Sequence, residues 1–128
     1  MTRIFLTGAS GNVGRTIVRT IRDRQGFELA GGWCLEAGED LGALAGIGET
    51  GVKASAGLEE GLLAVKPDLV FDFSSAPLMK NSLETYLKLG LDAVVGTTGL
   101  TDEELAPVGA QVRAKGLRWS VAPNYGLG

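Results

Sequence analysis

The segment TGASGNVGR, residues 7–15, has the residue types and the spacing to hold a phosphate group. Gly8, Gly11 and Gly14 stand three residues apart, directly after a short apolar run. The first glycine permits a tight turn, the second lets a pyrophosphate approach the backbone, and the third lets a helix pack closely on a strand. Free N–H groups at the start of that helix would attract an anion. The segment is therefore a candidate dinucleotide fingerprint, with a glycine turn that binds nothing as the alternative.

The segment does not fit the phosphate loop of nucleotide hydrolases. That loop needs Gly-Lys followed by Ser or Thr after a four-residue spacer, whereas Arg15 and Thr16 follow Gly14 here. A dinucleotide fingerprint also continues with an acidic residue about 20 positions on, where it binds the adenosine ribose. Cys34 and Leu35 stand at that place, so only Glu36 could serve, and only if the second strand runs on to it. Without a carboxylate there, nothing repels the 2′-phosphate of NADPH, and we expect either NADH or NADPH.

Three further segments rich in small polar residues follow predicted strands: DFSSAP (72–77), GTTGL (96–100) and APNYGLG (122–128). Ligands of open α/β sheets bind at the carboxyl ends of the strands. Thr97 and Thr98 offer hydroxyl and N–H groups, and Asn124 offers both a donor and acceptors. Each segment alone has an ordinary structural explanation, since Ser74 and Ser75 could simply cap a helix. Together with the glycine turn, however, they favour a ligand site at one edge of the sheet.

Strands and helices alternate along the whole chain, and the strands are continuous apolar runs. Such runs are typical of parallel strands that are covered by helices on both faces. Thr101 and Glu104 have the spacing of a capping box at a helix start. The predicted strands are 3–7, 27–33, 52–54, 68–74, 91–96 and 117–121, and the predicted helices are 12–24, a turn near Leu44, 58–65, 77–89 and a last one after Thr101. We predict an α/β fold of Rossmann type, a doubly wound, mostly parallel sheet with helices on both faces.

Composition excludes several classes of function. The chain has 128 residues and a net charge of −3, and it has no basic stripe, which argues against a nucleic-acid surface. It has no apolar run of about 18 residues and no secretion signal, so we expect a cytoplasmic protein that does not bind membranes. Histidine is absent and Cys34 is the single cysteine. This excludes a histidine base within the chain and leaves a zinc site almost without ligands, so no metal is expected.

The segments GASGNVGR, DFSSAP, GTTGL and APNYGLG, in this order and spacing, resemble the N-terminal domain of dihydrodipicolinate reductase. That family reduces 4-hydroxy-tetrahydrodipicolinate with NADH or NADPH in the bacterial and plant synthesis of diaminopimelate and lysine. The resemblance implies that residues 8–13 hold the pyrophosphate, that residues 96–98 line the nicotinamide, and that residues 122–125 close around it. The implied cofactor-binding residues are Gly8, Ala9, Ser10, Gly11, Asn12, Val13, Cys34, Phe73, Ser74, Gly96, Thr97, Thr98, Ala122, Pro123, Asn124 and Tyr125, with Thr98 also a candidate substrate contact.

The resemblance places the rest of the chemistry outside this chain. The family's proton donor and substrate contacts lie in a second domain, in a His-His-x-x-Lys helix and a Ser-Gly-Thr loop. Residues 1–128 are therefore expected to form one dinucleotide-binding domain that contains no catalytic residue and turns over little substrate alone. The implied full-length enzyme is a homotetramer that transfers hydride from C4 of the nicotinamide. Tyr125 and Gly126 replace the family's commoner Phe-Ser pair.

Three alternatives stay open on the sequence alone. TGASGNVGR is also similar to the start of short-chain-dehydrogenase-type proteins, including non-catalytic modules that sense NAD(P). Catalytic members of that group need a Tyr-x-x-x-Lys pair, but Tyr86 is followed by Lys88, and no lysine follows Tyr125. The first domain of an amino-acid dehydrogenase and a purely structural α/β domain are the other two alternatives.

Overall fold

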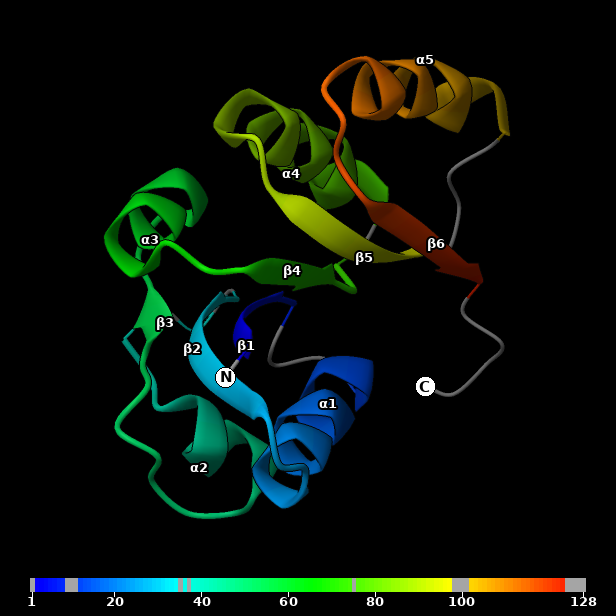
Figure 1. Ribbon diagram of the computed structural model, residues 1–128. Helices are drawn as coiled ribbons and strands as arrows, with labels where there is room; N and C mark the ends of the chain where they lie inside the picture. The colour runs from blue at the N-terminus through cyan, green and yellow to red at the C-terminus, as the bar shows by residue number, and fades with distance from the viewer. Residues whose placement is uncertain are drawn as a thin grey trace.

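The computed structural model describes residues 2–8, 12–34, 36, 38–74, 76–97 and 102–123. Strands and helices alternate along these residues (Figure 1). The strands are β1 (Thr2–Thr7), β2 (Phe27–Trp33), β3 (Ala54–Ser55), β4 (Leu69–Asp72), β5 (Asp92–Thr97) and β6 (Trp119–Pro123). The helices are α1 (Asn12–Asp23), α2 (Leu41–Ala45), α3 (Leu58–Val65), α4 (Ala76–Leu89) and α5 (Asp102–Ala114).

The strands form one parallel sheet in the order β3-β2-β1-β4-β5-β6. From β1 the chain first moves outward to β2 and β3. It then crosses back to β4, on the other side of β1, and continues outward to β5 and β6. The direction of winding therefore reverses between β1 and β4. The predicted Rossmann-type, doubly wound sheet is confirmed, and the reversal point is where open α/β sheets bind their ligands.

Helices cover the sheet on both faces, with α1 and α2 on one and α3, α4 and α5 on the other (Figure 1). Neighbouring residues of β1 show why its sequence is apolar without alternation. Phe5 packs in the cluster on the α3–α5 face, and Leu6 packs in the cluster on the α1–α2 face. Both side chains are fully buried. Because successive side chains of a strand point to opposite faces, a strand between two helical layers needs apolar residues at every position.

Two strands begin later than the sequence predicts, because the first residues of each predicted strand are hydrogen-bonded to the end of the preceding helix. The N–H of Leu91 donates to the carbonyl of Tyr86 at 3.0 Å, and the N–H of Leu117 donates to that of Val112 at 3.0 Å. These bonds close the carboxyl ends of α4 and α5. As a result β5 spans 92–97 and β6 spans 119–123 in place of the predicted 91–96 and 117–121.

The segment between β2 and β3 is organised around the carboxylate of Asp40. One oxygen accepts from the N–H groups of Gly42 (2.8 Å) and Ala43 (3.1 Å), which caps α2, and the other accepts from Gly51 (2.8 Å). The N–H of Thr50 bonds to both oxygens. Lys53 pairs with Asp40 in an isolated antiparallel bridge. For this reason the third strand starts at Ala54 and not at residue 52 as predicted.

The structure gives no sign of a membrane-crossing helix within the residues that it describes.

Candidate functional site

The first glycine of the fingerprint is wedged between the ends of two other strands. Gly8 has a φ of +84°, and its N–H donates to the carbonyl of Trp33, the last residue of β2, at 2.8 Å. A Cβ at this position would lie 2.9 Å from the N of Ser74 and 3.0 Å from the C of Phe73, just after β4. A side chain is thus excluded both by the backbone conformation and by the neighbouring backbone. The turn leads toward α1, which begins at Asn12.

A second glycine extends this row of contacts to the next strand. A Cβ on Gly96, near the end of β5, would collide with the ring of Phe73. The phenyl ring therefore lies directly over the Gly96 backbone. These contacts form one row along the carboxyl ends of four neighbouring strands. The row runs from Trp33 of β2 through Gly8 after β1 and Phe73 after β4 to Gly96 of β5. This edge contains the reversal point between β1 and β4.

A buried polar cluster, which we call the Asp72 cluster, lies beneath this edge. It consists of Thr7, Asp72, Ser74, Ser82 and Tyr86, all of them buried. One carboxylate oxygen of Asp72 accepts from the N–H of Ser74 at 2.9 Å and from its hydroxyl at 2.5 Å. The other oxygen accepts from the hydroxyl of Tyr86 at 2.8 Å. The Tyr86 and Thr7 hydroxyls are 2.6 Å apart, and Ser82 is hydrogen-bonded to the same aspartate and tyrosine.

The carboxylate sets the direction of the hydrogen bonds around it. Because the single hydroxyl proton of Tyr86 goes to Asp72, Thr7 must donate to Tyr86. Burial raises the pKa of Asp72, although the hydrogen bonds from Ser74, Tyr86 and Ser82 oppose that rise. Burial, with the nearby charge of Asp72, raises the pKa of Tyr86 well above its usual value. Tyr86 therefore stays neutral and acts as a hydrogen-bond donor.

The cluster also explains why β4 is shorter than predicted. The sequence DLVFDFS predicts a strand over 68–74, but β4 ends at Asp72. The Asp72 side chain takes the N–H of Ser74, which turns the chain away from the strand direction. Ser74 thus bonds backward to Asp72. Whether Ser74 or Ser75 also caps α4 stays a prediction, because Ser75 lies outside the described residues.

Most of the described candidates for cofactor contact gather at this edge. Phe73 and Ser74 touch Gly8, and Phe73 touches Gly96. Ala122 and Pro123 of β6 pair with Gly96 and Thr97 of β5. Asn12 and Val13 open α1. The candidates Ala9, Ser10, Gly11, Thr98, Asn124 and Tyr125 lie outside the described residues.

Cys34 lies next to β2 but faces the core. It is 3% exposed and packs with Leu6 and Leu41 on the α1–α2 face. It fills space as a small apolar residue, as predicted, and its contact with the cofactor stays a prediction. Strand β2 ends at Trp33 and does not run on to Glu36, whose side chain is exposed. The strand extension that would have brought Glu36 to the ribose position is absent.

Sequence reasoning missed the Asp72 cluster. Tyr86 drew attention only as half of a catalytic pair with the wrong lysine spacing, whereas its hydroxyl is committed to Asp72 and Thr7. A signal was present, because Asp72 is a charged residue at the end of a run that otherwise reads as a fully buried strand. Buried carboxylates require hydrogen-bond donors, and the sequence alone does not say which residues supply them.

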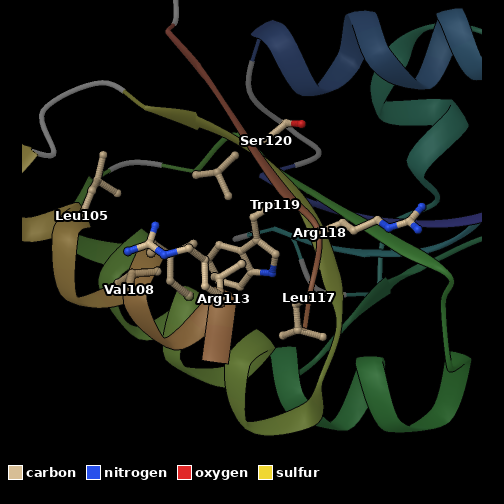
Figure 2. Close-up of a pocket in the computed structure, with 11 residues that line it drawn as sticks. Leu105, Val108, Arg113, Leu117, Arg118, Trp119 and Ser120 are labelled. Carbon is tan, nitrogen blue, oxygen red and sulfur yellow. The ribbon is translucent and has the colours of Figure 1, made fainter. Parts of the chain in front are cut away.

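The structure also has a hollow of about 350 Å³ between α5 and the sheet (Figure 2). Trp119 lies against α5 there, and its Nε1 donates to the carbonyl of Leu91 at 2.9 Å. Arg118 and Ser120 point away from Trp119, as alternation along a strand requires (Figure 2). Among the residues that the structure describes, those that line this hollow include none of the predicted cofactor contacts. The dinucleotide candidate is therefore the edge that carries Gly8.

Comparison with known proteins assigns the chain. The family described as "Dihydrodipicolinate reductase, N-terminus" matches residues 2–125. The chain belongs to this family. The family is an NAD(P)-binding domain, so the predicted resemblance is confirmed and the short-chain-dehydrogenase alternative is not supported.

Two relatives and two solved structures show how much of a longer protein this chain covers. The chain is 32% identical to the 4-hydroxy-tetrahydrodipicolinate reductase of Methanothermobacter thermautotrophicus and 33% identical to that of Methanosphaera stadtmanae. It aligns over its whole length with 49% of each, so it spans about half of these relatives. A dipicolinate-bound dihydrodipicolinate reductase from Paenisporosarcina sp. TG-14 has a TM-score of 0.80 at 26% identity, over 97% of this chain and 48% of that one. A biliverdin reductase from Synechocystis in complex with biliverdin and NADP+ shares the fold, with a TM-score of 0.74 at 20% identity over 94% of this chain and 37% of that one.

Proposed function

We propose that this chain binds NADH or NADPH along the carboxyl edge of its sheet and that the whole protein reduces 4-hydroxy-tetrahydrodipicolinate. The observation that carries the proposal is the position of Gly8. It stands at the reversal point of a Rossmann sheet, against the backbone of Phe73 and Ser74, where a Cβ would collide. Membership of the dihydrodipicolinate reductase family supports the substrate and the reaction.

The residues at this edge fit a dinucleotide. The turn after β1 leads into the N-terminus of α1, where the direction of the N–H groups and the helix dipole favour a pyrophosphate. Residues 8–13 would hold that group. Gly96 and Thr97 at the end of β5, with Ala122 and Pro123 beside them, would hold the nicotinamide end. Residues 98, 124 and 125 are the further proposed contacts.

The division of labour follows from what this chain contains. The bound nicotinamide supplies a hydride from C4, and the chain supplies binding, orientation and a fixed electrostatic surrounding. It has no histidine to donate a proton. We therefore place the proton donor and the substrate contacts in the part of the relatives that this chain does not span. We also propose that the whole protein forms an oligomer.

The experiment is a calorimetric titration with NADH and, separately, NADPH at one fixed salt concentration, on the wild-type protein and on Gly8→Ala. We expect wild type to bind at least one of them and Gly8→Ala to bind it at least about tenfold more weakly, since the Cβ displaces the turn. The matched control is Gly26→Ala. Gly26 has a φ of +87°, but a Cβ there meets nothing within 4 Å, and it lies at the opposite edge of the sheet.

The control separates local strain from damage to the site. Both alanines carry the left-handed backbone strain of about 1 kcal/mol, but only the one at position 8 touches the proposed binding edge. Gly26→Ala should bind the cofactor within about twofold of wild type. A folded wild-type protein that binds neither dinucleotide contradicts the proposal. Equal weakening by both variants contradicts the placement of the site at Gly8.

A further inference from the structure

Asp72 occupies an unusual place for a carboxylate that touches no proposed ligand group. It is the last residue of β4 and has no exposed surface. It lies directly before Phe73 and Ser74, the two residues that pack against Gly8. Its oxygens receive the N–H and the hydroxyl of Ser74 on one side and the hydroxyl of Tyr86 on the other. A buried charge with this many donors is held in one orientation.

The bonds to Ser74 act on the backbone that touches both glycines. The N of Ser74 is the atom nearest to a Cβ built on Gly8, at 2.9 Å, and this same N donates to Asp72. The N–H of Phe73 donates to the carbonyl of Thr7 at 3.1 Å, which ties the turn to the end of β1. The ring of Phe73 covers Gly96 on the other side. A shift of residues 73 and 74 would therefore move both ends of the proposed site.

The Tyr86 side of the carboxylate acts differently. Tyr86 lies on α4, and its ring packs in the core on the α3–α5 face, 6.3 Å from the ring of Trp119. Its hydroxyl links Asp72 to the side chain of Thr7, and the atoms nearest to a Cβ built on Gly8 or Gly96 belong to Phe73 and Ser74, not to Tyr86. The two sides of one carboxylate thus separate a bond that shapes the binding edge from a bond that holds the core.

We propose that Asp72 is a positioning residue for the dinucleotide. Its carboxylate holds residues Phe73 and Ser74 in the position in which they pack against Gly8 and Gly96. The inference rests on the proposed function, because it assumes that the cofactor lies along this edge. It assigns Asp72 no contact with the cofactor or the substrate. The inference requires only that residue 72 accepts a hydrogen bond from the N–H of Ser74.

The test compares the dissociation constants of NADH and NADPH with the free energy of unfolding in urea, both at pH 7, for wild type and three variants. In Asp72→Ala the Ser74 N–H loses its acceptor, and we expect the dissociation constant to rise about tenfold. In Asp72→Asn the amide oxygen still accepts from Ser74 while the NH₂ donates to Tyr86, so affinity should stay within about threefold of wild type. Tyr86→Phe should lower stability but leave affinity within about twofold.

The pattern distinguishes positioning from general stability. Loss of affinity in Asp72→Ala, rescue in Asp72→Asn and no loss in Tyr86→Phe support the inference. Wild-type affinity in Asp72→Ala overturns it. Weakening by Tyr86→Phe that equals the weakening by Asp72→Ala also overturns it, because affinity would then follow stability alone. Failure of wild type to bind either dinucleotide counts instead against the proposed function.

A fourth variant covers the case in which Asp72→Ala does not fold. The double change Asp72→Leu with Tyr86→Phe removes the carboxylate together with one of its donors, and it fills the volume with apolar atoms, which favours folding. It still leaves the Ser74 N–H without its acceptor. We expect the double variant to bind the cofactor about tenfold more weakly than Tyr86→Phe alone. Equal affinity of these two proteins overturns the inference.

Discussion

Two carboxylates of this chain, Asp40 and Asp72, organise two different regions in two different ways. Asp40 lies in the segment between β2 and β3, and its donors are mostly backbone N–H groups, those of Gly42, Ala43, Thr50 and Gly51. Asp72 lies at the end of β4, and its donors are the Ser74 N–H and the hydroxyls of Ser74, Ser82 and Tyr86. The first builds a loop; the second joins three elements beneath the proposed binding edge.

The two surroundings shift acidity in opposite directions. The N–H groups around Asp40, that of Thr50 above all, lower its pKa from the usual 3.8 to about 2 in spite of the cost of burial. At Asp72 burial outweighs the hydroxyl donors, and its pKa is raised. The cost of burial therefore decides the pKa of Asp72, whereas the surrounding N–H groups decide that of Asp40. The charge on Asp40 therefore favours the folded state, whereas charging Asp72 costs stability.

The largest expected effect comes from removing the second carboxylate. Asp72→Ala should lower the free energy of unfolding by about 3 kcal/mol, because several buried donors lose their acceptor at once. Urea denaturation at pH 7 measures this. The control is Asp72→Asn, which keeps one acceptor and should lose about 1 kcal/mol. If the alanine variant is no less stable than the asparagine variant, the donors of the Asp72 cluster do not depend on the carboxylate.

A smaller effect is expected from the core side of the Asp72 cluster. Tyr86→Phe removes one hydroxyl that donates to Asp72 and accepts from Thr7, while the ring keeps its packing. We expect a loss of about 1.5 kcal/mol in the free energy of unfolding. The comparison variant Thr85→Val removes a hydroxyl that bonds to a carbonyl of its own helix at the surface, and it should lose less than half as much. Equal losses would show that the buried hydroxyl has no special weight.

The smallest and most specific effects concern pH. The lowered pKa of Asp40 means that its contribution to stability is present above about pH 4 and disappears as the pH falls toward 2. The deficit of Asp40→Asn relative to wild type should therefore be largest near neutral pH and shrink below pH 4. Urea denaturation at a series of pH values from 2 to 7 follows this difference.

The raised pKa of Asp72 predicts the opposite sign. Between its usual pKa of 3.8 and its raised value in the folded protein, the unfolded chain releases a proton that the folded chain keeps. Wild type should therefore lose stability relative to Asp72→Asn as the pH rises above about 4, until Asp72 is charged in both states. Parallel pH profiles of the two asparagine variants would contradict the contrast between the two carboxylates.

The architecture of the domain could be predicted from local sequence patterns. Apolar runs that do not alternate predict strands covered on both faces, and the segments 27–33 and 58–65 have the bounds that the local pattern predicts. The glycine turn after β1 was also visible, because backbone conformation and residue size act within a few neighbouring positions. The same local physics carried the resemblance to the dihydrodipicolinate reductase family, which the comparisons confirm.

Which polar groups meet, by contrast, depends on how distant segments of the chain pack together. Thr7, Asp72 and Tyr86 lie 79 and 14 positions apart along their two hydrogen bonds, and they become neighbours only because β1 and β4 pair and α4 packs over them. Asp40 likewise finds Thr50 ten positions away through a loop without periodicity. Periodicity predicts which face of an element is buried, but it does not predict the contacts that form when distant strands pair. For this reason Asp72, the residue that we propose positions the cofactor site, read as an isolated charge in the sequence and became the centre of a cluster in the fold.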